Sequence, residues 1–329
     1  MRFFLLGDFQ SENGPGNANK RILEAMNLRY PTCVSNVADP ISRILEMITG
    51  VLKSQALLIC SKSELNYAAI LLAKLLHKPV YYILHGYASY EARLNGKKIR
   101  RLERYDAFIV RHADRIICVS PYAMAFMKEQ FPAQKERFDY IYNAVSVPKL
   151  YHEEERQENA ILSVGANMRR KACLPLAMAV ERLRRQGRDY QLILIGSKTD
   201  EYEKIRRFSC VDWREPMPHE ELLRLMARCP VYVQNSTFDT FALAPVEALY
   251  EGASVILSDY VGCKTLFGTL KEEECIHDPQ NIDEIARVID RVMQNGNYQR
   301  LLEGLNVKHI GVAWMSQRFS EIFGESADV

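Results

Sequence analysis

The sequence lacks any run of about 20 apolar residues, the length that a transmembrane helix requires. It also lacks a Cys-x-x-Cys pair: its eight cysteines are scattered, and most lie in apolar runs, as Cys60, Cys118 and Cys229 do. This distribution argues against a zinc site or a disulfide framework and favours a reducing compartment. The first residues, MRFFLL, form too short an apolar stretch for a signal peptide. We therefore expect a cytoplasmic protein.

The sequence has little excess of charge of either sign, since its net charge is only +2. The two halves differ, however. Residues 1–150 carry 21 Lys and Arg against 13 Asp and Glu, whereas the remainder carries 22 against 28. Much of the positive excess lies in one stretch that contains Lys97, Lys98, Arg100, Arg101 and Arg104. This stretch fits either a solvated helix face or a surface for anionic lipid headgroups, on the inner face of the cell membrane, or for a phosphate-bearing acceptor. Nucleic acid is not expected, because no aromatic residues are interleaved with the basic ones.

Short apolar runs alternate with helical patterns along all 329 residues, which is typical of parallel βαβ units. The expected strands are Phe3–Leu6, Ala56–Cys60, Val80–Leu84, Ile116–Val119, Tyr140–Tyr142, Ile161–Val164, Leu192–Ile195, Val231–Val233 and Val255–Leu257. The expected helices include Leu65–Leu76, Tyr122–Gln130, Ala172–Gln186, Glu220–Ala227 and Ile282–Met293. A polar segment at residues 152–158 separates the two series. The pattern predicts two doubly wound α/β domains.

The stretch Ser236–Gly262 predicts a loop, a helix and a buried strand. Pro245 suits the first turn of the helix, and Gly252 suits the position that follows its end. Such a helix directs free N–H groups and a positive dipole end at the space above the loop, which suits a diphosphate. Asp239 and Glu247 cannot bind phosphate, so we expect them to bind hydroxyl groups, as an acidic residue binds the ribose of dinucleotides.

This stretch resembles the carboxylate-x7-carboxylate motif of retaining GT-B glycosyltransferases of family 4, S-x-x-E-x-F-G-L-x-x-x-E-A-x-A-x-G-x-P-V. Glu247, Ala248, Gly252 and Val255 match it, whereas Asp239 replaces the first Glu, Ala242 the Gly, and Ser254 the Pro. The resemblance implies that a nucleotide-sugar donor contacts Asp239, Phe241, Ala242, Leu243 and Glu247. Because Asp is one methylene shorter than Glu, the contact of Asp239 with the sugar is expected to be altered or mediated by water.

Two segments of the first half resemble the same family. Gly14, Pro15 and Gly16 predict a turn in which Gly14 and Gly16 allow close backbone approach, followed by a helix capped by Asn17 or Asn19. The turn is similar to the family's glycine-rich first loop, which lies against the donor diphosphate or the acceptor, although plain loops often contain such glycines.

The segment His85-Gly86, with Glu91 six residues after the histidine, resembles the family's H-G-x-x-x-x-E. The resemblance places His85 beside the reactive carbon of the donor sugar, as a catalytic residue. The alternative for His85 is a structural histidine at the end of a strand. For Glu91 the alternative is a favourable charge at the start of a helix.

In the second half, Gly165 and Lys171 match the family pattern V-G-R-x-x-x-x-K-G, in which the Arg and Lys neutralise the diphosphate. Ala166 and Ala172 occupy the positions of the Arg and the second Gly, so we expect Arg169 or Arg170 to supply the missing charge. The alternative is a basic helix start, which is unfavourable without an anion nearby.

Three residues have equally plain structural explanations. Trp213, in VDWREPMPHEEL, either lies beside the nucleobase or belongs to the core. Ser120 and Asn143 fall on family positions, but capping or turn roles explain them as well.

The resemblance implies a GT-B fold, in which two Rossmann-like domains face a central cleft. Residues 1–150 form the acceptor domain, residues 151–311 the donor domain, and a helix at 312–329 packs back on the first domain. It implies transfer of a sugar, with retention, from a UDP- or GDP-linked donor to a hydroxyl of a saccharide or lipid-linked glycan of the cell surface, with His85, Asp239 and Lys171 in catalytic roles. The chain has no D-x-D pair, the diphosphate-metal motif of another glycosyltransferase architecture, so we expect neither a metal nor another cofactor. Two alternatives remain, an epimerase or hydrolase of the nucleotide-sugar and an inactive donor-binding subunit.

Overall fold

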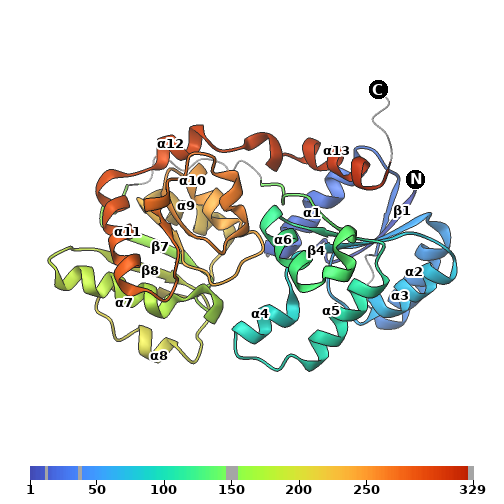
Figure 1. The fold of residues 1–329 in the computed structure, drawn as a ribbon, viewed down its shortest axis with the longest axis horizontal. Coiled ribbons are helices and arrows are strands. Elements are labelled where there is room, and N and C mark those ends of the chain that lie inside the picture. Colours follow the sequence, from blue (N-terminus) through green and yellow to red (C-terminus); the bar gives the residue numbers. More distant parts are fainter. Residues whose placement is uncertain (12–13, 36–38, 146–154, 325–329) are drawn as a thin grey trace. The chain divides into compact units, whose positions relative to one another are not determined.

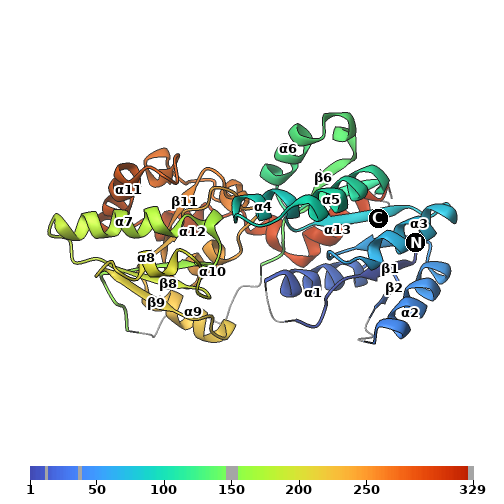
Figure 2. The same cartoon turned by 90° about the horizontal axis from the view of Figure 1, so that it is seen from below.

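The computed structural model describes residues 1–11, 14–35, 39–145 and 155–324. The chain divides into two compact units (Figures 1 and 2). Unit 1 consists of Met1–Tyr90, Lys98–Ala144 and Val307–Val329, and unit 2 of Glu91–Lys97 and Val145–Asn306. The expected domain boundary at residue 150 lies outside the described residues.

Unit 1 is built on a six-stranded parallel sheet with the strand order β2-β1-β3-β4-β5-β6. Its strands are β1 (Phe3–Leu6), β2 (Thr32–Val34), β3 (Ala56–Ile59), β4 (Val80–Leu84), β5 (Arg115–Cys118) and β6 (Phe138–Tyr140). Every residue of β1, β3 and β4 is buried, as expected for parallel strands covered on both faces.

Helices cover both faces of this sheet. The helical segments are α1 (Gly14–Asn27), α2 (Pro40–Lys53), α3 (Leu65–Leu75), α4 (Ala88–Leu94, of which residues 91–94 belong to unit 2), α5 (Arg100–His112), α6 (Pro121–Gln130), η1 (Pro132–Arg137), η5 (Val307–Ile310) and α13 (Val312–Ile322). Helices α1 and α13 pack against one another on one face, where Phe3 contacts Phe323 with ring centroids 4.7 Å apart. Helices α2, α3, α5 and α6 share the core of the other face, which includes Phe4 and Leu57.

Unit 2 contains a second six-stranded parallel sheet, in the order β12-β11-β10-β7-β8-β9. Its strands are β7 (Ala160–Val164), β8 (Gln191–Ile195), β9 (Val211–Arg214), β10 (Val231–Gln234), β11 (Ser254–Ser258) and β12 (Cys275–Ile276). Its helical segments are η2 (Arg169–Lys171), α7 (Cys173–Arg185), α8 (Tyr202–Ile205), α9 (His219–Arg228), α10 (Ala244–Tyr250), η3 (Gly262–Leu266), η4 (Glu272–Glu274), α11 (Ile282–Asn295) and α12 (Tyr298–Glu303). Helices α7 and α11 cover the face that includes Ile161, and α9 and α10 cover the face that includes Leu162.

The two parallel sheets confirm the expected pair of doubly wound α/β folds. The expected strand at Tyr140–Tyr142 lies two residues too late, since β6 spans Phe138–Tyr140. The expected turn at Gly14-Pro15-Gly16 is wrong, because α1 begins at Gly14 and the three residues form its first turn, where proline is tolerated. None of the described helices is both long and apolar enough to cross a bilayer.

Candidate functional site

In unit 2, candidate site residues follow the ends of β7 and β10. Gly165 comes directly after β7 with φ +93°, a conformation that favours glycine, and its N–H donates to the carbonyl of Ile195 at 2.8 Å. The short helix η2 holds Arg169, Arg170 and Lys171, and α7 begins two residues later. The loop after β7 thus places three cationic side chains just before the start of α7.

A buried ionic cluster joins this loop to the loop after β10. Oδ2 of Asp239 lies 2.5 Å from Nζ of Lys171 and 3.1 Å from Nη1 of Arg170. The three residues are each less than 10% exposed. Burial alone raises the pKa of Asp239, but Lys171 and Arg170 outweigh it and hold the pKa below its ordinary value of 3.8. The carboxylate of Asp239 is therefore ionised at neutral pH.

Backbone hydrogen bonds fix the loop that carries Asp239. The N–H of Asp239 donates to the carbonyl of Tyr260 at 2.8 Å, and its carbonyl accepts from the N–H of Gly262 at 2.9 Å. The N–H of Thr237 donates to the carbonyl of Arg170 at 2.7 Å, which ties the two loops together. The carboxylate is thus positioned by its backbone as well as by its ion pairs.

Ala172 and Ala242 adopt left-handed backbone conformations, with φ of +47° and +64°. At both positions the family patterns given above have a glycine that this chain replaces by alanine. A left-handed conformation costs a residue with a Cβ about 1–2 kcal/mol, a cost that glycine avoids. The geometry of both loops is therefore kept although the residue that suits it best is absent.

The segment 91–97 of unit 2 adds two contacts to Arg170 that the sequence did not predict. Oε2 of Glu91 lies 3.4 Å from Nε of Arg170, and Oδ1 of Asn95 accepts from its backbone N–H at 3.1 Å. Burial lowers the pKa of Arg170, but Asp239 and Glu91 raise it above its ordinary value. Arg169, by contrast, has a side chain that is 46% exposed and pairs with Asp200.

Glu247 lies in α10, whose ends match the sequence-based expectation. Pro245 lies in the first turn, and Gly252 follows the helix with φ +94°. The N–H groups of Gly252 and Ala253 close it by donating to the carbonyls of Leu249 and Ala248.

The carboxylate of Glu247 lies close to His219, at the start of α9. Oε1 of Glu247 is 3.6 Å from Nε2 of His219. Burial raises the pKa of Glu247, and although His219 opposes this effect, the shift remains upward. His219 had no sequence signal of its own, because nothing in its local pattern indicates a contact with α10.

Trp213, Phe241 and Leu243 complete the predicted set in unit 2. Trp213 is half-buried in β9 and donates its indole N–H to the carbonyl of Gly196 at 2.8 Å. Its ring meets that of Tyr202 edge-on, with centroids 5.1 Å apart, and packs against the core. Phe241 is buried in the Asp239 loop, whereas Leu243 is partly exposed just before α10.

In unit 1, His85 follows β4 and hydrogen-bonds to Asn19 of α1. The amide of Asn19 donates to the carbonyl of Asp8 at 2.9 Å, so its Oδ1 accepts from Nε2 of His85 at 2.7 Å. Burial lowers the pKa of His85 to about 4, although a backbone hydrogen bond with Cys60 opposes this. His85 is therefore neutral at pH 7, and Asn19 holds the histidine rather than capping the helix.

The remaining predicted residues lie at the surface, except for Gly16, whose backbone packs closely against another segment. Gly14 is exposed, whereas Gly16 is buried, and a Cβ there would lie 2.4 Å from the carbonyl oxygen of Ser11. Lys97, Lys98, Arg100, Arg101 and Arg104 are all exposed; Lys97 belongs to unit 2, the other four to unit 1. Within the described parts of the chain, no group of three or more His, Cys, Asp and Glu is arranged to hold a metal ion.

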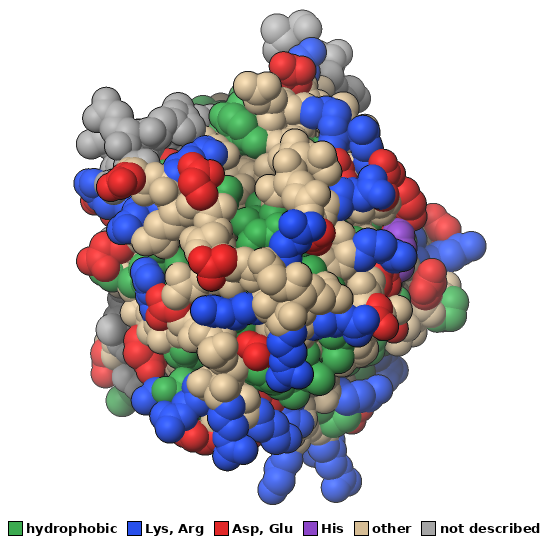
Figure 3. Space-filling model, turned by 90° about the vertical axis from the view of Figure 1, so that its left-hand side faces the viewer, with side chains coloured by type: hydrophobic (Ala, Val, Ile, Leu, Met, Phe, Trp, Pro, Cys, Tyr) green, Lys and Arg blue, Asp and Glu red, His purple; other side chains and the backbone are tan. Residues whose placement is uncertain are grey.

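The face of unit 2 that carries α7 and α11 mixes basic and acidic side chains (Figure 3). Arg182 pairs with Asp283, and Arg188 pairs with Asp290 at 2.7 Å. Opposite charges are interspersed over much of this face, whereas Lys and Arg side chains predominate at its lower margin in Figure 3.

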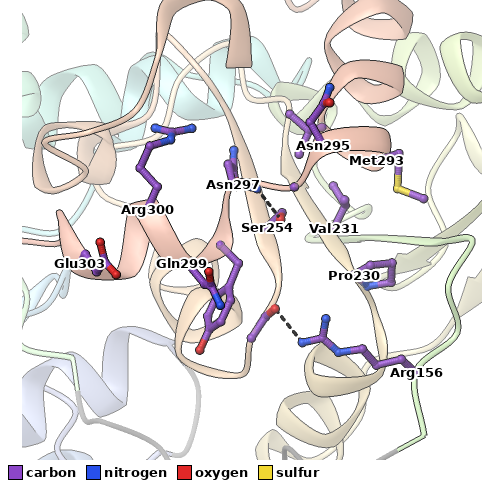
Figure 4. Close-up of a pocket in the computed structure, with 14 residues that line it drawn as sticks. Arg156, Pro230, Val231, Ser254, Met293, Asn295, Asn297, Gln299, Arg300 and Glu303 are labelled. Carbon is purple, nitrogen blue, oxygen red and sulfur yellow. Dashed lines mark hydrogen bonds between the residues drawn. The ribbon is translucent and has the colours of Figure 1, made fainter.

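A pocket of about 570 Å³ lies at the other end of the strands of this sheet, where β10 and β11 begin (Figure 4). Its polar groups already bind one another: Asn297 donates to Oγ of Ser254, and Arg156 donates to the carbonyl of Gly252. The ionic cluster lies at the carboxyl ends of the strands, near the ends of β7 and β10. The pocket is therefore separate from the candidate site.

Comparison with known proteins identifies two matching families. Residues 151–303 match the family "Glycosyl transferases group 1", and residues 43–148 match "Glycosyltransferase Family 4". Among curated proteins, no match to this sequence is found.

Several solved structures share the fold at low sequence identity. HepE of Anabaena, in complex with UDP and glucose, is 14% identical with a TM-score of 0.71, over 98% of this chain and 99% of that one. Sucrose-phosphate synthase from Thermosynechococcus elongatus is 15% identical with a TM-score of 0.71, over 99% and 100%. The lipopolysaccharide outer core galactosyltransferase WaaB is 16% identical with a TM-score of 0.67, over 99% and 100%.

Proposed function

Because the chain belongs to family 4 of the GT-B glycosyltransferases, we propose that it transfers a hexose from a UDP-linked donor to a hydroxyl group, with retention and without a metal ion. The observation that carries the proposal is the buried cluster of Arg170, Lys171 and Asp239 at the start of α7. Two cations and the N–H groups of a helix start suit a diphosphate. The choice of UDP over GDP rests on HepE, which binds UDP and glucose.

In the proposed reaction, the acceptor oxygen forms a bond to the anomeric carbon of the hexose. The bond between that carbon and the diphosphate oxygen breaks, and UDP leaves with the electron pair. The proton of the acceptor hydroxyl passes to the leaving phosphate on the same face. Lys171 stabilises the charge that develops there, which preorganised charges in a buried site do effectively. Glu247 holds the ribose hydroxyls, and neutral His85 binds the sugar.

The acceptor is proposed to be a saccharide or a lipid-linked glycan, in keeping with the acceptors expected from the family resemblance. An inactive donor-binding subunit is the second candidate, favoured by one observation: Asp239 already occupies the cations that the diphosphate needs.

The test combines binding and turnover. Titration calorimetry with UDP, GDP, UDP-glucose and UDP-galactose should show tight binding of one base only. The Glu247→Gln variant should bind that nucleotide about tenfold more weakly, because it loses charge-assisted hydrogen bonds to the ribose. Glu220→Gln, which changes an exposed carboxylate of α9, serves as the control.

Turnover then separates the candidates. UDP release that depends on an added saccharide acceptor supports the transferase. Rapid stoichiometric turnover of donor alone would identify an epimerase or hydrolase, and tight binding without any UDP release would identify the inactive subunit. The absence of binding by all four nucleotides would refute the proposal.

A further inference from the structure

Helix α2 of unit 1 exposes a stripe of large aliphatic side chains. Ile41, Ile44, Leu45, Ile48 and Leu52 are 72%, 47%, 60%, 36% and 52% exposed. Their spacing of three, four, seven and eleven residues from Ile41 places them on one side of an α-helix. Single exposed aliphatic residues are common, but five on one helix form a contiguous patch that marks an interaction site.

Helix α2 cannot rotate about its axis to bury this stripe, because contacts already hold its opposite side and both of its ends. Met47 and Val51 are buried in the core, and Gly50 lies so close to Phe4 that a Cβ would come within 2.4 Å of its ring. At the start, Asp39 accepts from the N–H of Ser42 at 2.8 Å. At the end, Lys78 donates to three carbonyls, including that of Leu52 at 2.8 Å. The apolar stripe is therefore a permanent surface of unit 1.

The neighbouring helices extend this surface and give it a charge. Helix α3 packs beside α2 and exposes Leu71 (53%) and Leu75 (76%). Helix α5 packs beside α3 through Phe108, whose ring centroid lies 4.6 Å from that of Tyr67, and its first two turns expose three arginines. These are Arg100, Arg101, which pairs with Glu64, and Arg104. One layer of helices thus presents both aliphatic and basic side chains.

We propose that this α2–α3 surface docks on a bilayer of anionic phospholipid, with the arginines of α5 at the headgroups. An aliphatic helix face accompanied by basic residues is typical of helices that lie in a membrane interface. A second copy of the chain fits less well, because residues 1–150 carry a net charge of +8 and would repel their counterpart. The inference goes beyond the proposed function and requires neither donor nor turnover.

Vesicle co-sedimentation of the full chain tests the proposal. Wild-type protein should bind phosphatidylglycerol-containing vesicles at least tenfold more tightly than phosphatidylcholine vesicles, since anionic lipid attracts each basic residue near the surface. The triple variant Ile41→Ser, Leu45→Gln, Ile48→Ser should lose at least tenfold in binding to anionic vesicles. The matched control Leu28→Gln, Val307→Gln changes two exposed aliphatic residues elsewhere, 62% and 51% exposed, and should bind as the wild type does.

Two further measurements keep the test decisive. The single variant Leu45→Gln should melt at the wild-type temperature and still bind anionic vesicles more weakly, so a misfolded triple variant would not obscure the result. Arg100→Gln with Arg104→Gln should weaken binding mainly at low salt. Failure of the wild type to bind anionic vesicles would overturn the proposal, as would wild-type binding by the aliphatic variants. A dimer in light scattering that the triple variant dissociates would assign the surface to a second copy instead.

Discussion

The two units place their candidate site residues alike but give them opposite electrostatic character. In unit 1, His85 follows β4, hydrogen-bonds to an amide and is kept neutral by burial. In unit 2, Lys171 and Asp239, near the ends of β7 and β10, form a buried ion pair. Ionic groups suit a diphosphate, whereas a neutral imidazole suits the hydroxyls of a sugar. The difference predicts that variants in unit 2 alter nucleotide binding and that variants in unit 1 alter turnover.

The largest effect is expected for Asp239→Asn. Removing this carboxylate leaves Lys171 buried without the carboxylate that pairs with it and should lower the free energy of unfolding by about 3 kcal/mol. UDP should restore much of that loss, because its diphosphate supplies the missing negative charge. Thermal melting with and without UDP measures both effects, and UDP should raise the melting temperature of the variant more than that of the wild type.

The pH dependence of stability provides a second test of the role of Asp239. The pKa of Asp239 is lower in the folded state than its ordinary value of 3.8, so its contribution to stability is present above about pH 4 and is lost as the pH falls below that value. Asp290→Asn, which removes a partly exposed partner of Arg188, is the control and should cost less than about 1 kcal/mol. If UDP gives the two variants the same increase, the carboxylate and the diphosphate do not share the cations.

Lys171→Ala should weaken UDP binding by about 30- to 100-fold and leave uridine binding unchanged, because only UDP carries the charge that Lys171 binds. Titration calorimetry with both ligands measures the difference. Arg169→Ala and Arg170→Ala, measured in the same way, show which arginine supplies the charge missing at Ala166. Equal losses for UDP and uridine would make Lys171 a structural residue.

His85→Ala tests the other side of the comparison, and we expect a loss of about tenfold in kcat with UDP affinity nearly unchanged. The folded-state pKa of His85, about 4, lies below its ordinary value of 6.5. Wild-type stability should therefore be complete above pH 6.5 and fall as the pH drops toward 4, and the variant should lack this slope. His112→Ala, in α5, is the control. Reduced stability with normal turnover per folded molecule would make His85 a structural histidine.

Local chemistry explains which parts of these sites could be predicted from the sequence. Pro245 and Gly252 bound α10 correctly, because a proline in the first turn and a left-handed glycine after the last act within a few residues. The same reasoning failed at Gly14-Pro15-Gly16, where a helix start and a turn favour the same residues. Strands β2 and β12, of three and two residues, are too short to show a period.

Contacts between distant segments were not predictable in this way. Asn95 and His219 reach Arg170 and Glu247 only because the fold brings separate elements together. The stripe on α2 was also missed, because a helical pattern of aliphatic residues predicts a buried face, and here a second set of aliphatic residues is exposed. The sequence thus indicates which residues lie near strand ends, but not which partners hold them.

The smallest effect is expected for Ala172→Gly. This variant tests whether the left-handed backbone at Ala172 in unit 2 is strained, a conformation that His85 in unit 1 does not adopt. Glycine relieves the cost of φ +47° but loses more chain entropy on folding, so we expect a net gain of only about 0.5 kcal/mol in the free energy of unfolding. Denaturant titration measures this gain, and Ala242→Gly should behave alike. Ala177→Gly, in the buried interior of α7, is the control and should lower stability by about 1 kcal/mol or more. A loss of stability in Ala172→Gly would show that the loop has no strain to relieve, whereas a gain with unchanged UDP affinity would show that the loop keeps its geometry at a small cost in stability.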